Sequence, residues 1–142
     1  MRTILAAGGL SLLLTLLVTP QFIKFLTRRQ YGQFIRQDGP TQHLTKRGTP
    51  TMGGVVIILA TIVAWLIGSF VAGAGPSWSG LLLVFLFAGL GVIGLLDDGI
   101  KIMRQRSLGL HPSGKIIGQV LIASAFALGT LILPNEFGEY AG

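Results

Sequence analysis

The chain has 142 residues, of which 51% are hydrophobic and only 11% are charged, and it contains no cysteine. An ordinary soluble domain carries about 25% charged residues, so this composition indicates an integral membrane protein. The lack of cysteine excludes a disulfide framework, a cysteine-ligated metal and a thiolate nucleophile.

Four apolar stretches are long enough to cross the roughly 30 Å hydrocarbon core of a bilayer as helices. They cover about residues 4–22, 52–72, 80–96 and 116–133. The first does not resemble a cleaved secretory signal, because only one basic residue, Arg2, precedes it and three basic residues follow it closely. We therefore predict an all-α fold, a polytopic bundle of four transmembrane helices that forms a single integral membrane domain over residues 1–142.

The distribution of charge predicts the topology. The formal net charge is +6, and ten of the eleven basic residues lie either between spans one and two or between spans three and four. The positive-inside rule makes both segments cytoplasmic and both termini external. Attraction for anionic head groups or phosphates is a second use of these charges. A nucleic-acid partner is not expected, because a basic stripe with interleaved stacking aromatics is missing.

The segment before the second span contains the run KRGTPTMGG at residues 46–54. Pro50 disfavours helix at the preceding residue, and Thr51 is a suitable N-cap for the second span. Unpaired amides at such a helix start would bind an anion, and two glycines would allow it to approach closely. The candidate binding residues are Lys46, Thr51, Gly53 and Gly54. A plain loop-to-helix turn uses the same residue types, so both interpretations stay open.

Small residues recur at intervals of four along the second span, a pattern that lets another helix approach closely. They are Ala60, Ala64, Gly68 and Ala72. The third span contains Gly89, Gly91 and Gly94, which suit either helix packing or the approach of a ligand. A short turn with Gly75-Pro76 separates these spans, so we expect an antiparallel hairpin.

Two adjacent carboxylates, Asp97 and Asp98, close the apolar run of the third span, and Lys101 follows on the same helical path. A charged side chain near hydrocarbon costs about 2.5–3.5 kcal/mol on insertion scales, so the pair marks a candidate functional site. Neighbouring helical residues project about 100° apart, and different roles for the two are therefore expected. Such a pair could bind Mg²⁺ together with substrate phosphates, or supply a general base or nucleophile.

A structural interpretation of the same cluster also stays open. The two aspartates could form an interfacial cap, paired with Lys101 and Arg104, whose side chains snorkel to water. The fourth span begins just after Lys115 and would direct a second helix N-terminus to this region. The two histidines, His43 and His111, lie in loops without paired metal-ligand spacing and are interpreted as solvated residues.

The run from Lys46 to Gly54, followed by Asp97-Asp98-x-x-Lys101 one span later, resembles the phospho-N-acetylmuramoyl-pentapeptide transferases of bacterial cell-wall synthesis. The segment from Arg106 to Lys115 also fits this family. Gly99 is a departure, since the family usually has a bulky residue after the aspartate pair. The family has more spans than four, so the chain resembles an N-terminal portion, and we predict that it has no transferase activity by itself.

The resemblance implies transfer of phospho-N-acetylmuramoyl-pentapeptide from its UDP carrier to undecaprenyl phosphate, with Mg²⁺ as cofactor, giving lipid I and UMP. The partners would be UDP-N-acetylmuramoyl-pentapeptide, undecaprenyl phosphate and membrane lipid, and a homodimer is compatible with it. The reaction would occur at the cytoplasmic face of the bacterial inner (plasma) membrane. By position, Asp97, Asp98 and Lys101 would be catalytic, with the metal on the two aspartates. The substrate-binding residues would be Lys46, Thr51, Gly53, Gly54 and Lys115.

Two other functions remain open from the sequence. One is a sibling transferase that moves a different sugar 1-phosphate from a UDP carrier to a polyprenyl phosphate. The other is a non-enzymatic four-span scaffold or transporter component. A transporter is disfavoured, because no charged residue lies at mid-membrane depth, where the substrate sites of secondary transporters are found.

Overall fold

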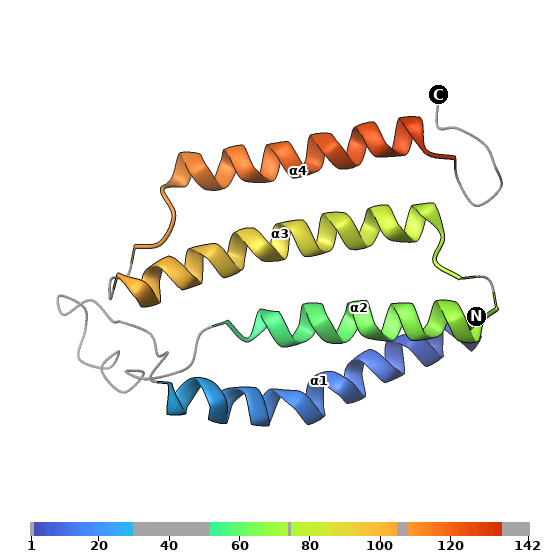
Figure 1. The fold of residues 1–142 in the computed structure, drawn as a ribbon, viewed down its shortest axis with the longest axis horizontal. Coiled ribbons are helices and arrows are strands. Elements are labelled where there is room, and N and C mark those ends of the chain that lie inside the picture. The colour runs from blue at the N-terminus through green and yellow to red at the C-terminus, as the bar shows by residue number, and fades with distance from the viewer. Residues whose placement is uncertain (1, 30–51, 74, 105–107, 135–142) are drawn as a thin grey trace.

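The computed structural model describes residues 2–29, 52–73, 75–104 and 108–134. Four helices account for most of them: α1 (Arg2–Arg28), α2 (Gly54–Val71), α3 (Trp78–Met103) and α4 (Pro112–Ile132). Successive helices run in opposite directions, so α1 begins at the same end of the bundle where α4 finishes (Figure 1). All four are long and apolar enough to cross a membrane. The predicted all-α bundle of four spans is confirmed, and the described residues contain no strand.

The ends of the helices differ from the predicted spans at the places that matter for the site. Helix α3 runs on to Met103, so the aspartate pair lies inside the helix. Helix α4 starts at Pro112, which is favoured at a first helical position, and Lys115 therefore lies in its first turn. The N-cap of α2 is Gly53, with no side-chain cap, which corrects the prediction of Thr51. Thr51 itself lies outside the described residues.

The small-residue pattern of α2 packs against α1, as predicted. Ala60 and Ala64 are among the few buried side chains, and the hydroxyl oxygens of Ser11 and Thr61 lie 3.2 Å apart between the two helices. A Cβ added at Gly68 would lie 3.1 Å from the Cβ of Ala7. Small side chains therefore let α1 and α2 approach closely.

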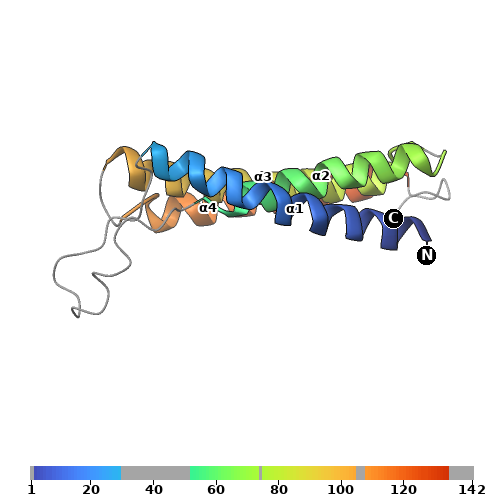
Figure 2. The same cartoon turned by 90° about the horizontal axis from the view of Figure 1, so that it is seen from below.

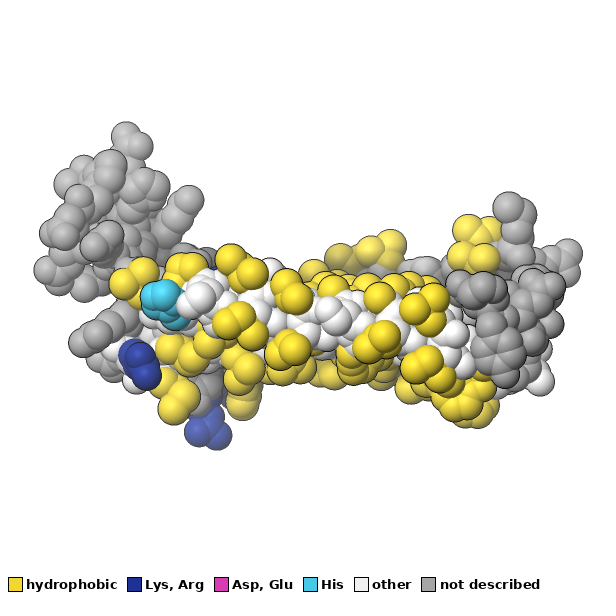
Figure 3. All heavy atoms as spheres, turned by 90° about the horizontal axis from the view of Figure 1, so that it is seen from above, with side chains coloured by type: hydrophobic (Ala, Val, Ile, Leu, Met, Phe, Trp, Pro, Cys, Tyr) yellow, Lys and Arg dark blue, Asp and Glu magenta, His cyan; other side chains and the backbone are white. Residues whose placement is uncertain are grey.

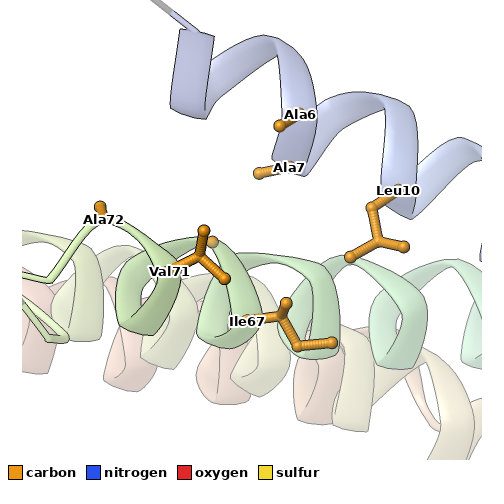
Figure 4. Close-up of a pocket in the computed structure, with 7 residues that line it drawn as sticks. Ala6, Ala7, Leu10, Ile67, Val71 and Ala72 are labelled. Carbon is orange, nitrogen blue, oxygen red and sulfur yellow. The ribbon is translucent and has the colours of Figure 1, made fainter.

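Helix α1 contains Pro20, which removes a backbone donor and favours a bend. The helix is visibly bent and crosses α2 obliquely (Figures 1 and 2). Near the beginning of α1 the two helices leave an apolar pocket of about 280 Å³ between them (Figure 4). Its lining residues are Ala6, Ala7, Leu10, Ile67, Gly68, Val71 and Ala72.

Helices α2 and α3 form the expected antiparallel hairpin, with Gly73 and Gly75 in the left-handed region at φ 73° and 70°. The packing interpretation holds for two α3 glycines. A Cβ at Gly89 would lie 3.0 Å from Ile122 of α4, and one at Gly91 would collide with Ile58 of α2. An apolar groove of about 440 Å³ nevertheless remains between α2 and α3.

Most large apolar side chains of the described residues face outward, and only a few hydrophobic residues are buried. Apolar side chains cover the flank of the bundle in Figure 3, while the histidine and the basic side chains visible there lie at one end. Such a surface suits lipid, which is as apolar as the side chains themselves. The polar end is the one where α3 finishes and α4 begins.

Candidate functional site at the α3–α4 end of the bundle

The site forms where the last turns of α3 meet the first turn of α4, at the end of the bundle where α2 also begins (Figure 1). Its central residue is Asp97, which is 5% exposed and is the one buried charged residue in the described part of the chain. A buried carboxylate is costly unless it is paired and hydrogen-bonded. The groups that pair with Asp97 and donate hydrogen bonds to it therefore define the site.

Three groups compensate the charge of Asp97. The ammonium groups of Lys101 and Lys115 lie 2.7 and 2.9 Å from its Oδ2. The backbone amide of Leu110 donates a hydrogen bond of 2.8 Å to its Oδ1. Lys101 lies one turn further along α3, whereas Lys115 and Leu110 come from α4 and from the loop before it. Asp97 thus joins α3 to the start of α4.

Asp98 has a different environment from Asp97. Its side chain is 31% exposed, and Lys101 Nζ lies 3.2 Å from its Oδ1. This is the single ion pair of Asp98 among the described residues. Its second oxygen has no partner of that kind there, so Asp98 has more capacity than Asp97 to bind an added cation.

The loop geometry explains how Lys115 reaches Asp97. His111 is the N-cap of α4 with an extended backbone (φ −60°, ψ 140°), and Pro112 starts the helix. The His111 Nδ1 and Ser113 Oγ atoms lie 2.7 Å apart, so this histidine interacts within its own exposed turn. The positive end of the α4 dipole lies beside the cluster and adds to the field of the two lysines.

The start of α2 lies close to the end of α3. A Cβ added at Gly99 would lie 3.8 Å from the Cε of Met52. Met52 has a φ of 72°, which is uncommon for a residue other than glycine, and Gly53 and Gly54 follow it as exposed residues. The end of the 46–54 run therefore lies next to the aspartate helix.

The structure thus brings together Asp97, Asp98, Lys101 and Lys115, and it places Gly53 and Gly54 at the same end of the bundle. Lys46, Thr51 and His43 lie outside the described residues. Arg104 was expected to pair with the aspartates in the cap interpretation, but it forms no ion pair among the described residues. The second lysine that pairs with Asp97 is Lys115. The sequence did not reveal the contribution of Gly109 and Leu110, because a backbone donor has no side-chain signature.

The described residues contain no group of three or more histidines, aspartates or glutamates that could hold a metal alone. Magnesium commonly uses one or two carboxylates together with substrate phosphates, so fewer than three protein ligands are enough to bind it. Asp98 fits as one such ligand. Asp97 would have to exchange a lysine for the metal, because both its oxygens already have partners.

Comparison with known proteins finds similar proteins over nearly the whole chain. A family model described as phospho-N-acetylmuramoyl-pentapeptide-transferase signature 1 matches residues 46–58. The chain is 60% identical over 136 residues to the protein of that name from Beutenbergia cavernae, covering 96% of the chain and 38% of the relative. It is 51% identical over 142 residues to the one from Cutibacterium acnes, covering 100% and 40%.

A third similar protein of the same name, from Streptomyces griseus, is 55% identical over 136 residues, with 96% of the chain and 38% of the relative covered. The chain therefore spans about 40% of the length of the curated relatives that it matches. No solved structure matches it. The resemblance to this family predicted from the sequence is confirmed along the chain.

Proposed function

We propose that this chain forms part of a phospho-N-acetylmuramoyl-pentapeptide transferase. The enzyme would transfer the phospho-sugar-pentapeptide from its UDP carrier to undecaprenyl phosphate, producing lipid I and UMP. The observation that carries the proposal is that the start of the helix bearing the family signature lies beside the helix end with the aspartate pair.

The charges of the cluster suit a phosphoryl transfer. Lys101 and Lys115 contribute two positive charges at the end of α3, where the phosphates of the two substrates would have to meet. Positioned cations stabilise the charge that develops on a transferring phosphoryl group. Asp97 holds both ammonium groups at one place, which reduces the rearrangement needed when phosphate arrives.

Mg²⁺ is part of the proposal. Asp98 would hold the ion, with substrate phosphates as further ligands. Asp97 would become a second carboxylate ligand if one of its two lysines moved away to bind a substrate phosphate. The metal would neutralise phosphate charge during transfer. A direct test is the electron paramagnetic resonance titration of the purified chain with Mn²⁺ as a substitute. Asp98→Asn should weaken binding, whereas Thr130→Val, on the far part of α4, should not.

We also propose that the chain lies in the bacterial inner (plasma) membrane, with both termini external and the cluster facing the cytoplasm. The positive-inside distribution of the basic residues supports this orientation. Cysteines introduced singly at Gly114 and Gly73, at opposite ends of the bundle, allow a clean test because the chain has none of its own. In intact cells a membrane-impermeant maleimide should label Gly73→Cys and leave Gly114→Cys unlabelled.

Activity can be tested in a chimera that joins residues 1–142 to the part of the Beutenbergia cavernae protein that the match does not cover. Membranes containing the chimera should form lipid I and release UMP in the presence of Mg²⁺, and Asp98→Asn should reduce the rate by about 10²–10⁴-fold. The 142-residue chain by itself should form no lipid I.

The alternatives predict other results in the same assay. A sibling transferase would release UMP from a different UDP-sugar and not from UDP-N-acetylmuramoyl-pentapeptide. A scaffold would leave the chimera inactive, or its activity indifferent to Asp98→Asn. Either result, obtained with a chimera that is folded and inserted in the membrane, would refute the proposed function.

A further inference from the structure

We propose that Gly109 and Leu110 are positioning residues, and that the α3–α4 loop holds Asp97, and through it both lysines, in the geometry needed for catalysis. Neither residue would touch substrate. The catalytic consequence rests on the proposed function, whereas the contact itself can be tested without any activity.

The loop contacts Asp97 in two ways, and the first is a hydrogen bond. The Leu110 amide donates to Asp97 Oδ1 at 2.8 Å, thirteen residues away in the chain. Both ammonium groups meet the other oxygen, Oδ2. The amide therefore takes up one oxygen and leaves the second for the two cations, which fixes the orientation of the carboxylate plane.

The second contact is the close approach of Gly109 to Asp97. A Cβ at Gly109 would lie 2.7 Å from the Asp97 Cγ and 2.7 Å from its backbone oxygen, with Oδ1 also in collision. Real Cβ atoms are essentially never found under 3.0 Å from a neighbour. The neighbour cannot yield easily, because one atom is helix backbone and the carboxylate is held by three partners.

The glycine is needed for this space and not for an unusual backbone. The positive-φ glycines of the described residues are Gly73 and Gly75, so the φ of Gly109 lies outside the left-handed region. Gly114, five residues further along, has nothing within 4 Å of an added Cβ and the same ordinary φ range. The two glycines thus form a matched pair in which an added methyl group changes the site at one position only.

Displacing the loop would move more than one side chain. Lys101 and Lys115 share the oxygen that the loop orients, so a turn of the Asp97 carboxylate shifts both cations relative to Asp98. A misplacement of about 1 Å can reduce a catalysed rate about 10²-fold. Substrate affinity would change less, since Asp98 and the lysine charges are all retained.

The hydrogen bond can be tested in the 142-residue chain by NMR in nanodiscs. In the unmodified chain the Leu110 amide should exchange with deuterium more slowly than that of His111. Asp97→Ala should accelerate Leu110 exchange by roughly tenfold or more, in line with the loss of a charged hydrogen bond. Asp98→Ala should leave it unchanged.

The positioning effect can be tested in the chimera. Gly109→Ala should reduce kcat by about 10²-fold, while the KM values for both substrates change less than kcat, and Gly114→Ala should leave kcat unchanged. An inactive parent chimera would count against the proposed function and leave the amide measurement as the test of the contact.

Two results would overturn the inference. One is a Leu110 amide that exchanges as fast as its neighbours in the unmodified chain, or is indifferent to Asp97→Ala. The other is a folded Gly109→Ala chimera whose kcat equals that of Gly114→Ala. If Gly109→Ala does not fold, the exchange of the unmodified chain decides alone.

Discussion

The two helix pairs of this bundle are held together by different means. Helices α1 and α2 meet through small side chains, with one contact between hydroxyl groups, and none of their charged side chains that the structure describes is buried. Helices α3 and α4 are joined at their polar end by one buried carboxylate with three partners. Both pairs pack closely at glycines, and the second pair also depends on a charge that must be compensated.

This difference separates scaffold from site. Close packing of small residues positions a helix without leaving any group free for chemistry. A buried charge costs free energy, and it also concentrates charged groups at one place. The proposed reaction centre lies on the second pair, and variants of the two pairs should therefore behave differently.

The largest effect is expected from removing the charge that links α3 to α4. Asp97→Ala leaves Lys115 and the Leu110 amide without their acceptor and leaves Lys101 with Asp98 alone. The lost hydrogen bond to a charged group costs about 1.5–3 kcal/mol, and each lost ion pair adds under about 1 kcal/mol because both lysines are one-third exposed or more. Asp98→Ala removes a partly exposed carboxylate and should cost under about 1 kcal/mol. Denaturant unfolding in detergent micelles, followed by circular dichroism, measures both. Equal losses would remove the distinction between the two aspartates.

The corresponding change in the first pair is steric. Gly68→Leu places a branched side chain where the Cβ of Ala7 already lies 3.1 Å from an added Cβ, and overpacking costs about 1–3 kcal/mol. Gly94→Leu, with nothing within 4 Å of its added Cβ, is the control. Unfolding should show a loss for the first variant alone. If Gly94→Leu is equally harmful, close packing is not what holds α1.

Within the charged cluster, the two lysines should differ. Lys115→Met removes an ion pair between helices and should cost about 1 kcal/mol, whereas Lys101→Met removes pairs within α3, worth about 0.3–0.5 kcal/mol. Both side chains are one-third exposed or more, which limits each effect. The expected order can be checked in the same unfolding experiment at low salt, and a reversed order would contradict it.

The smallest effect should come from the hydroxyl contact of the first pair. A double-mutant cycle of Ser11→Ala and Thr61→Val should give a coupling of about 0.6 kcal/mol, as is usual between membrane helices. Thr130 bonds a carbonyl of its own helix, so the cycle of Ser11→Ala with Thr130→Val should give no coupling. A coupling well above 1 kcal/mol would make polar contacts as important here as in the α3–α4 pair.

Much of the fold was predictable because membrane spans depend on local composition. The number of helices and the close packing of α2 through Ala60 and Ala64 follow from lengths and spacings that any membrane helix must obey. The helix ends were less predictable. Helix α3 continues past its apolar run to Met103, and there Asp97 and Lys101 form an ion pair one turn apart that hydropathy does not register.

The candidate site was predictable only in part. The presence of Asp97, Asp98 and Lys101 on one helical path predicted the cluster, and the family resemblance indicated the chemistry that we propose for it. The sequence could not show which aspartate is buried, because the two are neighbours at the end of the same apolar run. The difference comes from the loop before α4 and the first turn of α4, which cover Asp97.

The sequence by itself determined the four spans, the uneven distribution of charge and the residue types of the cluster, since these depend on composition and on spacings of a few residues. The tertiary structure decided that Asp97 joins α3 to Lys115 and to the Leu110 amide, that Asp98 stays accessible, and that Gly109 has no room for a side chain. Those facts depend on how a loop closes between two helices, and the energy that selects the closure is the compensation of one buried charge.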